Sequence, residues 1–143
     1  MTESTWTLNS TLARDSAPVG DLPLSRALLN EDANYPWLIL VPRRPALVEL
    51  IDLDQRARTQ LMGEIALASE ALKQITQCDK LNVAALGNSV AQLHVHVIAR
   101  FHRDAAWPNP VWNVLPRRAY QHAARDTLIA AIRNGLQIRP VQG

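Results

Sequence analysis

"QLHVHVIAR", residues 92–100, is the segment from which both the fold and the site can be deduced. Two sets of side chains alternate along it: Gln92, His94 and His96, and between them Leu93, Val95 and Val97. Successive side chains of a β-strand point to opposite faces, and same-face neighbours lie about 6.6 Å apart. The pattern therefore predicts a strand over 92–101, with two imidazoles on one face and an apolar face that packs against a helix.

The segments upstream predict the rest of an antiparallel sheet. "KLNVAALG" (80–87) is a strand candidate, and a turn beginning at "GNS" joins it to 92–101, so the two strands are expected to be antiparallel neighbours. "SRALLN" (25–30) and the continuous apolar run "WLILVP" (37–42) are separated by a few polar residues. This arrangement predicts a second antiparallel hairpin.

The segment after the hairpin changes to the helical period. Its apolar residues are spaced four, three, four and three apart: Leu61, Ile65, Ala68, Leu72 and Ile75. This single stripe predicts a long helix at about 54–77, because such residues share one helix face. Asp54 is expected to cap its first turn by accepting a backbone N–H bond.

The ends of the chain carry weaker patterns. Residues 1–23 contain prolines and a glycine and are expected to be irregular, and the proline-rich segment 107–116 is expected to be an extended surface arm. Residues 117–135 predict a second helix, ended by Gly135 at the C′ position. The predicted fold class is α+β: an antiparallel sheet of about five strands with one long helix and a C-terminal helix.

Composition limits the class of protein. The 143 residues fit one domain, 1–143, and 48% of them are apolar, which argues against a disordered chain. The net charge is only +2, from 15 basic and 13 acidic residues, which argues against a nucleic-acid partner.

The chain carries little sign of export or membrane attachment. Cys78 is its one cysteine, so an internal disulfide is excluded and a reducing compartment is the simplest interpretation. No apolar run approaches the roughly 20 residues that a membrane span needs, and the N-terminus lacks a signal-peptide pattern. We expect a soluble cytoplasmic protein with no membrane partner.

Paired histidines on one strand face have three interpretations. A zinc site needs three or four protein ligands, and no third ligand stands at a convincing spacing. Two histidines on the polar face of a half-exposed strand are the alternative without function. The third is nucleophilic catalysis, since neutral imidazole attacks phosphorus well and the "GNS" turn can present backbone N–H groups to an anion.

The chain also resembles the histidine triad superfamily, whose signature is His-x-His-x-His-x-x with apolar residues at x. "QLHVHVI" matches two of the three histidines and every apolar place, and "GNSVA" resembles the family's glycine–amide–Ser/Thr turn. "LLNEDANYPWLILVPRRP" resembles its early hairpin. The resemblance covers a core of about 20–103, leaving a C-terminal arm and helix at 104–143. It is strongest toward small bacterial proteins labelled diadenosine-tetraphosphate hydrolases.

The resemblance implies a mechanism without metal or cofactor. His94 falls at the middle position, the nucleophile that attacks the α-phosphate of a nucleotide and forms a covalent nucleotidyl-histidine, and His96 falls at the third. The implied substrate contacts are Asn82 for the phosphate, Asn88 and Ser89 in the turn, and Asn30 or Asp32 for the ribose. Family members usually form two-fold dimers, so a homodimer is expected.

Gln92 departs from the signature, because it stands at the first histidine position. A carboxamide can donate and accept hydrogen bonds but carries no proton charge. Two functions therefore stay open: a hydrolase in which Gln92 orients the catalytic groups, and a nucleotide-binding module without turnover.

Overall fold

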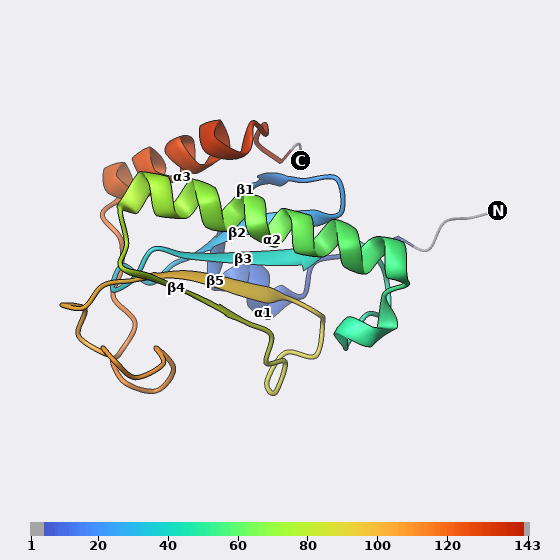
Figure 1. Ribbon diagram of the computed structural model, residues 1–143, viewed down its shortest axis with the longest axis horizontal. Coiled ribbons are helices and arrows are strands. Elements are labelled where there is room, and N and C mark those ends of the chain that lie inside the picture. Colours follow the sequence, from blue (N-terminus) through green and yellow to red (C-terminus); the bar gives the residue numbers. More distant parts are fainter. Residues whose placement is uncertain (1–4, 142–143) are drawn as a thin grey trace.

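A five-stranded antiparallel sheet forms the centre of the computed structural model, which describes residues 5–141 (Figure 1). The strands are β1 (Ser16–Asp21), β2 (Ser25–Asn30), β3 (Trp37–Pro42), β4 (Lys80–Ala84) and β5 (Val95–Arg100). Their order across the sheet is β1-β2-β3-β5-β4, and every neighbouring pair is antiparallel. The predicted α+β class, the β2–β3 hairpin and the pairing of β4 with β5 are confirmed.

Strand β5 lies inside the sheet, between β3 and β4. It pairs with β3 through Ile39 and His96, and with β4 through Ala84 and His96. All six of its residues are buried. The strand begins at Val95 and ends at Arg100, a shorter range than the predicted 92–101, so Gln92 and His94 lie just before it. A strand with partners along both edges cannot slip in register without losing both ladders, so His96 stands on the most constrained part of the sheet.

The expectation of an irregular N-terminal region is wrong for residues 10–21, while residues 5–9 do lack helix and strand. Residues Ser10–Arg14 form a short helix, α1, and β1 follows directly. Pro18 and Gly20 argue against a central strand, but β1 is an edge strand, where both residues are tolerated. The register shifts between them, as expected for a bulge.

The long helix forms as predicted. It is α2 (Gln55–Thr76), and the Asp54 carboxylate accepts the backbone N–H of Ala57 at 2.8 Å. Leu61, Ala68 and Leu72 of the predicted stripe are buried. Figure 1 shows α2 running along the sheet with α3 (His122–Leu136) beside it. None of the helices within residues 5–141 has the length and hydropathy needed to cross a membrane.

The C-terminal helix has different ends from those expected. It begins at His122 rather than 117, and the left-handed capping residue is Gln137, with φ of 55°, rather than Gly135. Gly135 lies inside the helix, where a Cβ would come within 3.2 Å of the Ala71 Cβ on α2. The glycine therefore permits close packing of the two helices instead of ending one of them.

The alternation along β5 divides the two sides of the sheet. Val97 and Ala99 join a core with residues of α2 and α3, while Leu93 and Val95 pack with the first half of α2. This confirms the predicted apolar face. Ile98 points the other way, into a second core that also contains Leu12 of α1 and Val111.

The predicted extended arm, 107–116, is instead a series of turns folded against this second core. Ala106 and Val111 are buried, and Trp112 packs beside them. The prolines do exclude helix and strand, as expected, but the apolar side chains between them give the segment a surface to bury.

The buried Arg100 at the end of β5 anchors this segment. Its guanidinium donates to both oxygens of Asp104, at 2.8 and 3.0 Å, and to the Asn109 carbonyl at 2.9 Å. Burial alone raises the pKa of the Asp104 carboxyl, but hydrogen bonds from Arg100 and from the N–H groups of Phe101 and Trp107 hold it below its ordinary value. The ion pair is therefore formed at neutral pH and fixes where the chain turns back toward the sheet.

Glu64 is a buried acidic residue that the sequence pattern did not single out. Its carboxylate oxygens accept the backbone N–H groups of Leu24 at 2.7 Å and Ser25 at 2.9 Å, between β1 and β2. The side chain therefore ties the middle of α2 to the first hairpin. Both N–H groups would be left without a partner if it were removed.

We expect Glu64→Ala to lower the free energy of unfolding by about 2–4 kcal/mol, because two buried donors lose their acceptor. Urea denaturation followed by circular dichroism measures the change. Glu70→Ala, at an exposed position of the same helix, is the control and should change stability by less than about 0.5 kcal/mol. Equal losses in the two variants would show that the Glu64 hydrogen bonds contribute no net stability.

Candidate active site

A cavity of about 490 Å³ opens on the sheet face opposite α2 and α3. It brings together five of the predicted site residues: Asn30, Asn88, Ser89, His94 and His96. Thr11, Leu12 and Asp15, from α1 and the residue after it, also line it. Segments far apart in the sequence thus converge on the two histidines.

His94 is positioned by a backbone carbonyl. Its Nδ1 lies 2.7 Å from the carbonyl oxygen of Gln92. A carbonyl only accepts hydrogen bonds, so Nδ1 carries the proton in this contact. The lone pair of the neutral ring is then on Nε2, the nitrogen that a nucleophile needs free.

His96 has the opposite tautomer, because a tryptophan donates to it. The indole Nε1–H of Trp37 lies 2.9 Å from His96 Nδ1, and an indole nitrogen has no lone pair to accept with. The proton of neutral His96 is therefore on Nε2. Burial, with a smaller contribution from His94, lowers the pKa of His96 to about 4, so the ring is neutral at physiological pH.

The two rings stand side by side with complementary roles. Their centroids are 4.9 Å apart and their planes are 74° from parallel. Both residues are only 7% exposed. One imidazole offers a lone pair and the other offers a donor, which is the pair of groups needed to attack a phosphorus atom and hold one of its oxygens.

Two tryptophans that the sequence analysis did not assign to the site enclose His96. The rings of Trp37 and Trp112 lie 5.5 and 5.1 Å from it, edge to face. Both line the cavity. Trp37 occupies the first position of a continuously apolar strand, so no local pattern distinguished it. Trp112 could have been suspected only as an aromatic residue in a proline-rich segment.

The turn before the histidines contributes the rim of the cavity. Gly87, Asn88 and Ser89 all line it. Gly87 has φ of +73°, a left-handed conformation that side chains other than glycine adopt at a cost. The glycine of the "GNS" motif is thus required by the backbone geometry of this turn.

The two residues expected near the ribose have different surroundings. Asn30 lines the cavity, and its amide oxygen accepts from Arg117 Nη2 at 3.3 Å. Asp32 does not line it; its Oδ1 accepts from the backbone N–H groups of Asn34 and Arg118. The geometry favours Asn30 for ligand contact and gives Asp32 a role in holding the loop.

Two other predicted site residues are engaged outside the cavity. Asn82 lies on the same sheet face as the histidines, but its amide oxygen accepts from Arg100 Nη1 at 2.8 Å. Gln92 turns its carboxamide toward the N-terminal segment and binds backbone groups of Thr7 and Asn9. The pairing of β4 with β5 brings Asn82 to that face, but the sequence carried no information on which partner each amide would find.

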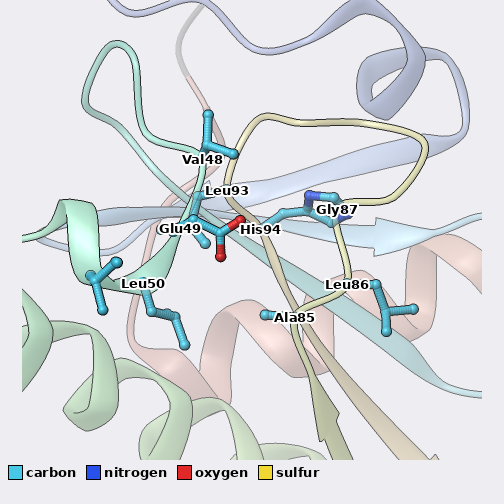
Figure 2. Close-up of a pocket in the computed structure, with 9 residues that line it drawn as sticks. Val48, Glu49, Leu50, Ala85, Leu86, Gly87, Leu93 and His94 are labelled. Atoms are coloured by element: carbon cyan, nitrogen blue, oxygen red, sulfur yellow. The ribbon is translucent and has the colours of Figure 1, made fainter.

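A second, smaller cavity of about 170 Å³ shares His94 with the first. Figure 2 shows Leu50 and Leu86 on opposite sides of it, with Glu49 and His94 between them. Its lining is mostly apolar, so the surroundings of His94 are polar on one side and largely apolar on the other.

Within residues 5–141, no three side chains of the metal-binding types cluster closely enough to hold an ion.

Comparison with known proteins agrees with this geometry. The sequence profile of the HIT domain matches residues 12–103, which is more than half of the chain. The chain belongs to the histidine triad family. None of the curated protein sequences compared with it matches.

Solved structures of histidine triad proteins have the same fold over nearly their whole length. One from Bradyrhizobium japonicum is 56% identical, with a TM-score of 0.92 over 93% of this chain and 99% of that one. A second, from Sinorhizobium meliloti, is 40% identical, with a TM-score of 0.90 over 92% and 97%. A third, from Marinobacter aquaeolei, is 36% identical, with a TM-score of 0.91 over 94% and 98%. These matches confirm the resemblance to the histidine triad superfamily. That superfamily is one of nucleotide-binding proteins and hydrolases.

The buried neutral His96 should make stability depend on pH. Its pKa is about 4 in the folded protein and about 6.5 when unfolded, so the unfolded state binds more protons between these values. The free energy of unfolding should therefore fall as pH decreases through this window. His96→Asn retains an acceptor for Trp37 and cannot titrate. The free energy of unfolding of this variant should therefore fall less than that of wild type, by about 2 kcal/mol near the lower end of this pH window. Urea titrations at several pH values measure this, and parallel curves for the two proteins would contradict it.

Proposed function

We propose that this protein is a nucleotide phosphohydrolase or nucleotidyltransferase acting at an α-phosphate through a covalent nucleotidyl-histidine on His94. The substrate class is a dinucleoside polyphosphate, such as a diadenosine polyphosphate, or a nucleoside phosphoramidate. One observation carries the proposal: two neighbouring imidazoles have opposite tautomers, set by the Gln92 carbonyl and the Trp37 indole, at a cavity that also contains Asn30.

The first step forms a bond between His94 Nε2 and the α-phosphorus while the bond from phosphorus to the leaving oxygen or nitrogen breaks. The leaving group takes the electron pair and accepts a proton from the Ser89 hydroxyl or from water. His94 becomes a positively charged nucleotidyl-imidazolium, whose Nδ1–H still donates to the Gln92 carbonyl. That contact stabilises the charge as it develops.

The second step replaces the histidine by water or another acceptor. The acceptor attacks phosphorus and loses its proton to solvent or to Ser89, where it replaces the proton given to the leaving group. The P–N bond breaks, and its electron pair returns to His94 Nε2. The Nε2–H of His96 supports both steps by donating to a phosphoryl oxygen, and its low pKa keeps that group neutral. Asn30 contacts the ribose and Asn88 the phosphate, and no metal or cofactor takes part.

A nucleotide-binding module without turnover is the alternative, motivated by Gln92 at the first triad position. The Gln92 carboxamide binds Thr7 and Asn9 and does not line the cavity, so the lone pair of His94 and the donor of His96 do not involve it. This supports the hydrolase. Tight AMP binding without product over hours would support the module.

We also infer a homodimer and a cytoplasmic location. Strand β4 is an edge strand with Val83 48% exposed on it, and Met62 of α2 is 62% exposed. An unpaired edge that carries an exposed valine suits a second copy whose sheet continues the first. The location is inferred from Cys78, a buried free thiol.

His94→Ala should lower turnover of labelled diadenosine tetraphosphate and of adenosine 5′-phosphoramidate by at least about a thousandfold, because the covalent step loses its nucleophile. Product release is measured by chromatography. Acid-quenched wild-type protein should carry label on His94. His122→Ala, at an exposed histidine, is the matched control and should retain full turnover. Equal rates for His94→Ala and wild type would refute the mechanism.

The dimer is tested by Val83→Asp, which places a charge on the β4 edge. Light scattering should give about twice the 15.9 kDa chain mass for wild type and the single-chain mass for the variant, because a charge buried in an apolar interface is costly. Val83→Thr, which keeps the branched shape without a charge, should stay dimeric. A wild-type mass near 15.9 kDa would contradict the proposal.

A further inference from the structure

The Gln92 side chain makes a two-point contact with the N-terminal segment. Its Oε1 accepts the backbone N–H of Asn9 at 2.8 Å, and its Nε2 donates to the backbone carbonyl of Thr7 at 2.9 Å. The partners are more than 80 residues away in sequence. Both ends of the carboxamide are thus used, and both partners are main-chain groups.

This arrangement reproduces one rung of a parallel β-ladder. In such a ladder, the C=O of one residue accepts from the N–H of residue i+1 on the facing strand, and the N–H of that same residue donates to the C=O of residue i−1. Here residue i is Leu8, and the Gln92 carboxamide takes the place of that residue's C=O and N–H. Leu8 itself packs against the core on the cavity side of the sheet. The contact therefore fixes both the distance and the register of this segment.

The segment held by Gln92 leads directly into a wall of the cavity. The Asn9 side chain caps α1, accepting from the N–H of Thr11 at 2.8 Å and of Leu12 at 3.4 Å. Thr11 and Leu12 both line the cavity that contains His94 and His96. A displacement of Asn9 would be transmitted to this wall within one helical turn.

The main chain of Gln92 meets the other side of the same cavity. Its carbonyl oxygen accepts from His94 Nδ1 at 2.7 Å. One residue thus holds the N-terminal wall with its side chain and the nucleophile with its backbone. A neutral imidazole has one donor and one acceptor that point in widely divergent directions, so histidine at this position cannot make the paired contact.

We propose that Gln92 is a positioning residue that clamps the N-terminal segment as a wall of the nucleotide cavity, and that glutamine is required here for its carboxamide. This inference rests on the proposed function for its kinetic consequence, but the clamp itself does not. The clamp acts on nucleotide affinity more than on the chemical step, because it leaves the His94–Gln92 backbone contact in place.

Gln92→Met keeps the length of the side chain and removes both hydrogen bonds, and Gln92→His introduces the family's residue. In both variants, amide hydrogen exchange at Asn9 should accelerate at least about tenfold, since a peptide N–H loses its acceptor. KM for diadenosine tetraphosphate and Kd for AMP should rise about tenfold, while kcat falls by less than about threefold. Gln74→Met, at an exposed position of α2, is the matched control and should match wild type in every measurement.

The clamp is refuted if the Asn9 amide exchanges at the wild-type rate in Gln92→Met. The positioning role is refuted if exchange accelerates but KM and Kd are unchanged, or if kcat alone falls. Should wild type turn over no substrate, the proposed hydrolase fails, while Asn9 exchange and AMP affinity still test the clamp.

Discussion

The two-residue period of β5, held between β3 and β4, is the constraint on which the rest of this molecule depends. Because the strand has partners along both edges, its register is fixed, and every second side chain must face the same way. One set packs under α2 and α3. The other set includes His96, which stands at the wall of a cavity with His94 beside it. The core and the site thus lie on opposite faces of one strand, and a displacement of that strand would change both.

The chemistry of the site follows from what the two imidazoles touch. Each Nδ1 is occupied by a partner that can play only one role, an acceptor for His94 and a donor for His96. This leaves a lone pair on one Nε2 and a proton on the other, and neither Nδ1 partner is a charged group. Burial keeps His96 neutral, because a charged imidazole at that position would be costly. Further out, Arg100 and Asp104 hold the turns that bring Trp112 against His96.

Much of the fold could be predicted because its strongest patterns are local. Five apolar residues on one stripe specify α2, and the alternation in 92–100 predicted β5, although the strand begins only at Val95. The misses share a physical cause. Strand β1 contains Pro18 and Gly20, and only its place at the sheet edge makes them acceptable. Gly135 looked like a helix end, but it serves contact with Ala71 on another helix.

The sequence by itself determined which residues share a face and that two histidines stand together. These follow from backbone periodicity and residue type, which need only local information. Tertiary structure alone decided the tautomers, the choice of Asn30 over Asp32 at the cavity, and the partners of Asn82 and Gln92. A polar side chain bonds to whichever group the fold brings within about 3 Å, and those groups come from segments distant in sequence.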